Sequence, residues 1–139
     1  MLNTTRWGIL GASKFALEQM APAIHLASGA RLSALATSSY SKALAFQALQ
    51  PNLRIHDSYD ALLADPDIDA VYVPLPNHMH IEWTLKALDA GKHVLCEKPL
   101  AMNAADFDPV IQRRNSTGLL AAEAYMILHH PQWHKAKEL

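Results

Sequence analysis

A hexapeptide that begins with a glycine, Gly11–Ala16 (GASKFA), is the first segment whose residues could do chemistry. It directly follows an apolar run, where a dinucleotide-binding fold places its G-x-G-x-x-G turn against the pyrophosphate. Only Gly11 of the three glycines is kept, and Ser13 and Ala16 stand at the other two positions. The Ser13 hydroxyl can add a donor to the amides of a helix N-terminus, which already favour an anion. On these six residues alone, an ordinary strand-to-helix turn with a serine cap is an equal alternative.

The end of the second apolar run bears on the choice of nucleotide. An NAD-preferring fold presents an acidic side chain to the ribose hydroxyls there, whereas this chain has Thr37 and Ser38, with Lys42 shortly after. A hydroxyl-rich corner next to a lysine can accept a 2′-phosphate without charge repulsion. This favours NADP slightly over NAD. The alternative is a plain loop followed by a solvated lysine.

Histidine and cysteine residues give no metal signature. His78 and His80 are two residues apart, and His130 and His134 are four apart. Neither pair carries a carboxylate pattern such as H-E-x-x-H, so solvated or capping histidines are expected and no metal site is predicted. Cys96 is the single cysteine, which excludes an internal disulfide, and we expect it to be buried as a small apolar residue.

The elements that must position these residues alternate between strand and helix. Short apolar runs, typical of buried strands, occur at residues 6–10, 31–36, 70–73, 93–96 and 119–122. Helical spacing separates them, placing Ala16, Met20, Ala23 and Ala27 on one face and Ile81, Leu85 and Leu88 on another. Repeated β-helix-β units require a parallel sheet with right-handed crossovers. We therefore predict a doubly wound α/β fold of Rossmann type in three α/β/α layers.

Turn residues support this order. Gly29, Gly91 and Gly118 each stand between a helical pattern and the next apolar run, where a left-handed glycine can end a helix. Candidate helix caps are Ser41, Ser58, Asn77 and Asn103. Two prolines oppose regular helices: Pro22 predicts a kink or a late break, and Pro109 allows the fifth helix to begin near residue 108 instead of 103.

Composition excludes several classes of protein. The chain has 139 residues and a formal net charge of −1, which fits one domain and argues against a nucleic-acid partner. No apolar run approaches the roughly 18 residues of a membrane-spanning helix, and residues 1–7 lack the layout of a signal peptide. We expect a cytoplasmic protein without membrane contact.

Four motifs in fixed order carry a family resemblance: Gly8–Ser13 (GILGAS), Ala70–His80 (AVYVPLPNHMH), Ala90–Leu100 (AGKHVLCEKPL) and Glu123–Pro131 (EAYMILHHP). Together they resemble the N-terminal half of the Gfo/Idh/MocA oxidoreductases, which include glucose-fructose oxidoreductase, inositol dehydrogenase and many sugar dehydrogenases. The resemblance implies an NAD(P)-dependent oxidoreductase that transfers a hydride between the nicotinamide and a sugar, polyol or related hydroxy compound.

The resemblance also implies roles for individual residues. In the family's pyrophosphate turn stand Gly11, Ala12, Ser13 and Lys14, and at its ribose corner stand Thr37 and Ser38, with Lys42 beside them. The family's loop along the cofactor matches Leu75, Pro76, Asn77 and His80. Glu97 matches the residue near the nicotinamide ribose. Lys98 matches the lysine at the hydride-transfer site, where a cation stabilises a developing alkoxide. Without the resemblance, Glu97 and Lys98 would be interpreted as an exposed ion pair, and Asn77 equally well as a helix cap.

The chain departs from the family pattern near its end. Leu128 stands where many relatives have an arginine, and His129 stands where an aromatic residue is common. We expect a dinucleotide-binding domain over residues 1–122, a connection over residues 123–139, and no second α+β domain, so the piece would be a fragment or a truncation. The full-length family form is expected to be a homo-oligomer, and this chain alone is expected to turn over poorly. The alternatives are a non-catalytic dinucleotide-binding or regulatory module and, less favoured, a site for an S-adenosyl ligand.

Overall fold

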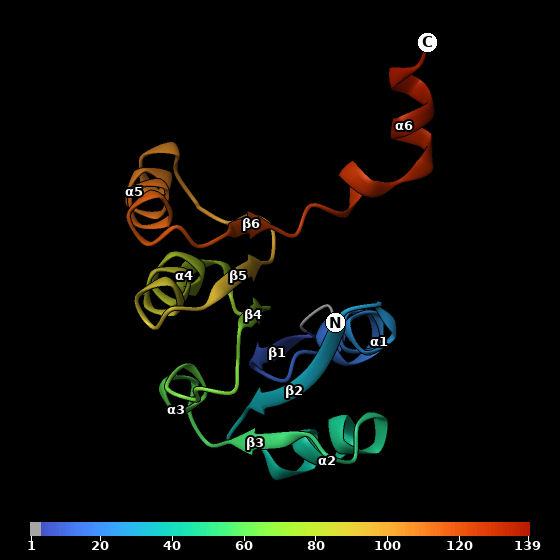
Figure 1. Ribbon diagram of the computed structural model, residues 1–139, viewed down its shortest axis with the longest axis vertical. Helices are drawn as coiled ribbons and strands as arrows, with labels where there is room; N and C mark the ends of the chain where they lie inside the picture. Colours follow the sequence, from blue (N-terminus) through green and yellow to red (C-terminus); the bar gives the residue numbers. More distant parts are fainter. Residues whose placement is uncertain (1–3) are drawn as a thin grey trace.

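A single six-stranded parallel sheet organises the protein, whose computed structural model describes residues 4–139 (Figure 1). Its strands are β1 (Thr5–Leu10), β2 (Ala30–Ala36), β3 (Arg54–His56), β4 (Ala70–Val73), β5 (His93–Cys96) and β6 (Ala121–Glu123). Their spatial order is β3-β2-β1-β4-β5-β6, and every neighbouring pair is parallel. The order reverses between β1 and β4, and such a switch point is where open α/β sheets bind ligands. The predicted fold class is confirmed.

Helices cover both faces of the sheet (Figure 1). One face carries α1 (Ala21–Leu26) and α2 (Tyr40–Leu49), and the other carries α3 (Tyr59–Leu63), α4 (His80–Asp89) and α5 (Phe107–Thr117). Because both faces are covered, successive residues of a strand are apolar whichever face they point to, as expected for a parallel sheet. Val71 and Val73 face one core, while Tyr72 between them faces the other.

The first helix differs from the predicted pattern. A π-helical turn over Ala16–Met20 precedes α1, with the Ala21 N–H bonding the Ala16 carbonyl. This wider turn moves the buried face to Ala16, Ala21 and Ile24 and leaves Ala23 exposed. The predicted face through Ala16, Met20, Ala23 and Ala27 is therefore wrong. Pro22 lies in the first turn of α1, so the chain changes helix type where a kink was expected.

Other local predictions had mixed outcomes. Gly29, Gly91 and Gly118 all have positive φ, as predicted. Ser58 caps α3 by accepting from the Ala61 N–H at 3.1 Å, whereas Ser41 caps nothing because α2 already begins at Tyr40. Asn103 precedes a 3₁₀ turn over Ala104–Asp106 without a side-chain cap bond. α5 begins at Phe107, with Pro109 in its first turn.

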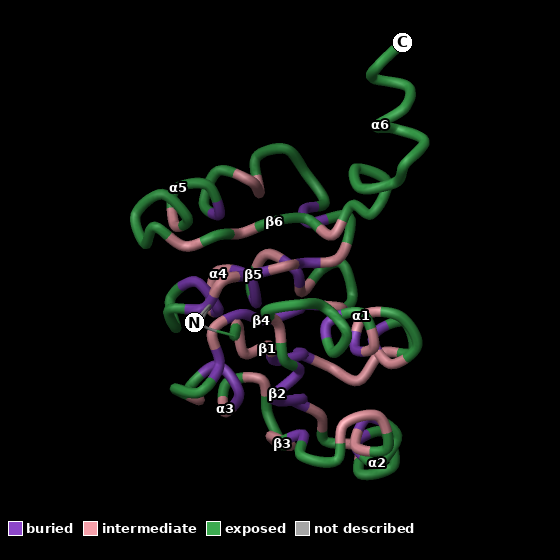
Figure 2. The backbone as a smooth tube through the Cα atoms, turned by 45° about the vertical axis from the view of Figure 1, so that its right-hand side comes forward, coloured by how far each residue is buried: buried purple, intermediate pink, exposed green. Residues whose placement is uncertain are grey.

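The C-terminal segment extends beyond the sheet. After β6 comes a 3₁₀ turn over Met126–His129 and then α6 (Pro131–Lys137), which projects away from the other elements (Figures 1 and 2). The segment is exposed although it is partly apolar, since Tyr125, Met126, Leu128 and Trp133 are each about half exposed or more. β6 ends at Glu123, so the predicted boundary after residue 122 falls inside a strand. Over residues 4–139, no helix has the length and apolar character needed to cross a membrane.

Candidate active site

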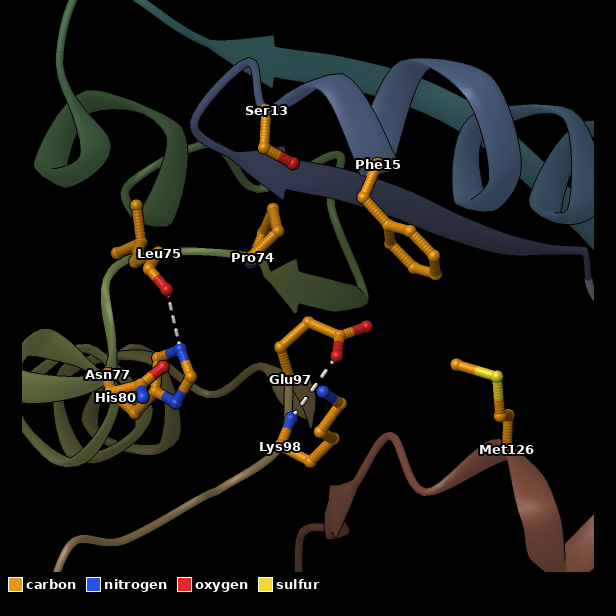
Figure 3. Close-up of a pocket in the computed structure, with 9 residues that line it drawn as sticks. All are labelled: Ser13, Phe15, Pro74, Leu75, Asn77, His80, Glu97, Lys98 and Met126. Atoms are coloured by element: carbon orange, nitrogen blue, oxygen red, sulfur yellow. Dashed lines mark hydrogen bonds between the residues drawn. The ribbon is translucent and has the colours of Figure 1, made fainter.

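A cleft of about 300 Å³ opens at the carboxyl edge of the sheet, where the loops after β1, β4 and β5 meet (Figure 3). Nine residues line it: Ser13, Phe15, Pro74, Leu75, Asn77, His80, Glu97, Lys98 and Met126. Six of these were predicted from the sequence, namely Ser13, Leu75, Asn77, His80, Glu97 and Lys98. The fold thus brings the predicted phosphate turn and the predicted catalytic lysine to one cleft.

The turn after β1 is built around Gly11. Gly11 has φ +97°, and its N–H donates to the Ala36 carbonyl at 3.0 Å. A Cβ at Gly11 would lie 2.9 Å from Leu75 Cδ2 and 3.3 Å from Tyr59 Oη. Neither this backbone conformation nor this approach tolerates a side chain. The turn therefore requires a glycine here.

Ser13 and Ala16 fill the two remaining positions of the turn. The Ser13 hydroxyl accepts from the Ala16 N–H at 3.0 Å, so it caps the helical turn and keeps its own proton free to donate. Ala16 is fully buried, consistent with close packing at this position. Lys14 is largely exposed and approaches Glu18 at 3.7 Å, a surface contact of little energetic weight.

The corner after β2 lies beside a second hollow of about 260 Å³. Its lining brings together residues of the β1 turn and of α2: Ala12, Ser13, Lys14, Leu17, Lys42, Ala45 and Phe46. Thr37 is fixed by its backbone, because its N–H donates to the His56 carbonyl at 2.9 Å and its hydroxyl accepts from Ser39 N at 3.1 Å. Ser38 is exposed and does not line the hollow. Two lysines thus face one depression next to the phosphate turn.

The loop after β4 carries Leu75, Pro76 and Asn77. Leu75 is buried, and Pro76 and Asn77 are exposed. Asn77 begins a 3₁₀ turn over Asn77–Met79 but occupies no cap position, since Pro76 stands there and its carbonyl accepts from Met79 N at 2.8 Å. The capping interpretation of Asn77 is therefore wrong.

His80 lies behind this loop and is fully buried. Its Nε2 is 2.7 Å from the Leu75 carbonyl oxygen, and its Nδ1 is 2.7 Å from the Pro99 carbonyl oxygen. Both ring nitrogens are committed to backbone. His80 also lines the cleft, and its contact with a cofactor stays a prediction.

Glu97 is held at the end of β5 by two hydrogen bonds. The Tyr72 hydroxyl donates to Glu97 Oε1 at 2.6 Å, and the Lys98 N–H donates to Oε2 at 3.2 Å. Burial, reinforced by the Glu97 charge, raises the pKa of the Tyr72 phenol well above its usual range, so Tyr72 remains a donor. Glu97 also lines an adjoining apolar hollow of about 210 Å³ that reaches Tyr125 and His129. Its carboxylate thus faces two depressions with a fixed orientation.

Lys98 is exposed, and its ammonium makes no ion pair with any residue in the range 4–139. The exposed Glu97–Lys98 ion pair that the isolated motif suggested is absent there, because Glu97 contacts Lys98 only through the backbone N–H. The Lys98–Pro99 peptide bond is cis. Glu123, at the end of β6, accepts from Leu100 N at 2.8 Å and fixes the segment that follows. The Lys98 ammonium therefore lies beside the cleft, on a turn that hydrogen bonds to Glu97 and Glu123 hold in place (Figure 3).

Sequence reasoning missed several residues of this site. Tyr72 is one of four consecutive buried residues of β4, and an apolar run gives no signal that a hydroxyl at one end finds a carboxylate. Glu123 was seen only as part of a motif, and its bond to Leu100 crosses 23 residues of sequence. Phe15 and Met126 line the cleft although their residue types suggest core positions.

Cys96 and the histidines do not add a reactive centre. Cys96 is buried, as predicted, and burial raises the pKa of its thiol to about 12, which keeps it protonated. Among residues 4–139, no group of three or more His, Cys, Asp or Glu side chains is arranged to hold a metal ion.

Known proteins are similar to this chain in sequence. The family model described as oxidoreductase family, NAD-binding Rossmann fold, matches residues 5–125. An uncharacterized oxidoreductase of Rhizobium meliloti is 43% identical over 95% of this chain and 40% of its own length. A D-xylose 1-dehydrogenase (NADP⁺) of Haloferax volcanii is 38% identical over 96% of this chain and 41% of its own length.

A solved structure agrees with these sequence relatives. A 3-ketoreductase from Actinomadura kijaniata in complex with NADP and TDP-benzene superposes with a TM-score of 0.92 at 36% identity. The match covers 98% of this chain and 42% of that protein, so the chain spans about two fifths of the length of these relatives. The match over residues 5–125 establishes that the chain belongs to the Gfo/Idh/MocA oxidoreductase family, of which it contains the NAD-binding Rossmann fold.

Proposed function

We propose that this chain binds a nicotinamide dinucleotide across the carboxyl edge of its sheet. In a protein that also carries a substrate domain, it would be the cofactor half of an oxidoreductase acting on a sugar, polyol or related hydroxy compound. The observation that carries the proposal is the single cleft shared by Ser13 of the β1 turn and Lys98 at the end of β5. It lies at the carboxyl edge of a doubly wound sheet, where such folds bind ligands.

The residues present fit a dinucleotide. Gly11, with φ +97° and its Cβ position closed by Leu75 and Tyr59, makes the tight turn that such a site needs. The Ser13 hydroxyl has a proton to donate, and the first amides of the helix that follows favour an anion. Glu97, oriented by Tyr72, offers a carboxylate to ribose hydroxyls. When bound, the nicotinamide supplies the hydride acceptor or donor.

Lys98 is the proposed catalytic residue. Loss of hydride from a carbon that bears a hydroxyl builds negative charge on the oxygen as its proton leaves, and a nearby cation stabilises that charge. The Lys98 ammonium is exposed and unpaired among the described residues, and its backbone is held by Glu97. It can therefore orient a hydroxyl or carbonyl oxygen of the substrate and stabilise the developing alkoxide.

We also propose that the chain prefers NADP over NAD. Lys14 and Lys42 line the hollow next to the phosphate turn, and no acidic residue occupies the corner at Thr37 and Ser38. The Haloferax relative is named as NADP⁺-dependent, and the Actinomadura structure holds NADP. The Haloferax relative is named a D-xylose 1-dehydrogenase and the Actinomadura relative a 3-ketoreductase, so the proposed substrate is a hydroxyl or carbonyl group of a sugar or related compound. We also propose a homo-oligomer for the complete protein.

Paired titrations of this chain with NADPH and NADH, followed by the fluorescence of the bound nicotinamide, test the proposal. We expect saturable binding of both, with NADPH tighter. A Lys42→Ala variant should narrow the difference between the two while still binding NADH, because it removes one of the two lysines that line the hollow proposed for the 2′-phosphate. Failure of both nucleotides to bind at any concentration would contradict dinucleotide binding by this chain.

A further inference from the structure

His80 joins the two loops that form the cleft. It is the first residue of α4, and its side chain is fully buried. The Leu75 carbonyl, 2.7 Å from Nε2, belongs to the loop after β4 that lines the cleft. The Pro99 carbonyl, 2.7 Å from Nδ1, directly follows Lys98. One imidazole ring therefore spans the distance between the cofactor-side loop and the turn that carries the free lysine.

The two partners of the ring are both backbone carbonyl oxygens. A carbonyl oxygen can only accept a hydrogen bond, so each ring nitrogen must donate. A neutral imidazole has one N–H, and its other nitrogen presents a lone pair. Both bonds can exist together only when the ring carries two protons. If the ring loses one proton, a lone pair faces a carbonyl oxygen and one of the two links must open.

We propose that His80 is a positioning residue whose doubly protonated ring locks the Leu75 loop to the Lys98–Pro99 turn, and that loss of one ring proton releases this lock. The proposal rests on the proposed function, since the two joined loops are those assigned to the cofactor and the reacting oxygen. No carboxylate bonds the ring among residues 4–139. The titratable residues on the adjoining segments are His78, Glu82, Glu97 and Lys98.

The first test observes the ring directly in this chain. In mildly acidic solution, long-range ¹H–¹⁵N spectra should show two slowly exchanging ring N–H protons for His80. His78 is exposed, so its ring protons should exchange rapidly and serve as the internal reference. Slow exchange of only one His80 ring proton, or of neither, would overturn the lock, whether or not the chain binds a cofactor.

The second test asks whether the lock matters for binding. NADH is the probe because its phosphates do not titrate near neutral pH, whereas the 2′-phosphate of NADPH does. The affinity of the wild-type chain for NADH should fall by about tenfold as the pH rises and one link opens, the size expected for one charge-assisted hydrogen bond. His80→Gln should bind about tenfold more weakly at low pH and show no such fall. His78→Gln should follow the wild-type profile.

The outcomes separate this inference from the proposed function. If His80→Gln remains folded by circular dichroism and its NADH affinity runs parallel to the wild-type profile, the positioning role is wrong although dinucleotide binding stands. If the wild-type chain does not bind NADH, the proposed function fails for this chain, and the exchange rates of the two ring protons still decide whether the lock exists.

Discussion

The two edges of the sheet use their charges in opposite ways. At the amino edge, Arg6 donates to Asp69 at 2.7 Å and to Asp67 at 2.8 Å, and the buried Lys92 donates to the Asp65 and Ile68 carbonyls at 2.7 and 2.8 Å. At the carboxyl edge, the Lys98 ammonium makes no such contact within residues 4–139.

This difference separates stability from function along one sheet. The ion pairs and hydrogen bonds of Arg6 and Lys92 fix the loop of residues 65–69. An unsatisfied charge beside a cleft contributes little to folding, and it is available for a substrate or cofactor. Variants at the amino edge should therefore change unfolding, and variants at the carboxyl edge should change binding and turnover.

The largest expected effect is on turnover, at Lys98. In a protein that includes the substrate domain, Lys98→Ala should lower kcat by about 10²-fold or more, because the charge beside the reacting oxygen is lost. Cofactor affinity and the unfolding midpoint should stay close to wild type, since the side chain is exposed. Steady-state kinetics and urea unfolding measure both, and near-normal turnover would remove Lys98 from the catalytic machinery.

Gly11→Ala should weaken both binding and stability. The added Cβ meets Leu75 at 2.9 Å at a φ of +97°, so we expect at least tenfold weaker NADPH binding and a loss of about 1–2 kcal/mol of unfolding free energy. Gly29→Ala is the matched control, because Gly29 also has positive φ but nothing within 4 Å of its Cβ. It should lose stability and keep NADPH affinity. Equal loss of NADPH affinity in both variants would contradict a role of the Gly11 turn in binding the dinucleotide.

Lys92→Met should lower stability and leave binding unchanged. The substitution keeps the apolar stem but removes the Lys92 donor from the Ile68 and Asp65 carbonyls, of which Asp65 still accepts from Ile68 N, and this should cost about 2 kcal/mol of unfolding free energy. Urea unfolding gives this value, and NADPH titration of the folded variant should match wild type. A variant that keeps its stability but binds NADPH poorly would reverse the roles assigned to the two edges.

The smallest expected effect is on the acid side of the stability curve. The hydrogen bond from Arg6 lowers the pKa of Asp69 to about 2, below its ordinary value. A lowered folded-state pKa means that the stabilisation is complete above about pH 4 and is lost as the pH falls toward 2. Solvent screening limits it to about 1 kcal/mol. Between these limits, the unfolding temperature of Asp69→Asn should fall less steeply with pH than that of the wild type. An equally steep fall would assign the acid sensitivity to other carboxylates.

Much of the fold was predictable because the sheet is buried on both faces. β4 and β5 have the predicted bounds, 70–73 and 93–96, since both are nearly continuous apolar runs. β3 was missed because it is three residues long and contains Arg54 and His56. The π-helical turn was missed as well, because hydrogen bonding five residues back has no residue signature comparable to a helical stripe.

The site was predictable as a set of residues but not as a set of contacts. Adjacent residues such as Glu97 and Lys98 mark a strand end that sequence alone can identify. The bonds that orient them cross long stretches of chain, 25 residues from Tyr72 to Glu97 and 19 from His80 to Pro99. Such pairs depend on the order of strands in the sheet, and a single sequence does not contain that order residue by residue.

The most direct test of the central claim is to titrate the isotope-labelled chain with NADPH and follow each backbone amide by NMR. We expect saturable shifts at residues 11–14 and 97–98 on the carboxyl edge, with residues 65–69 on the amino edge unchanged. Shifts confined to residues 65–69, or no saturable shift at either edge, would contradict the assignment of the cleft as a dinucleotide site.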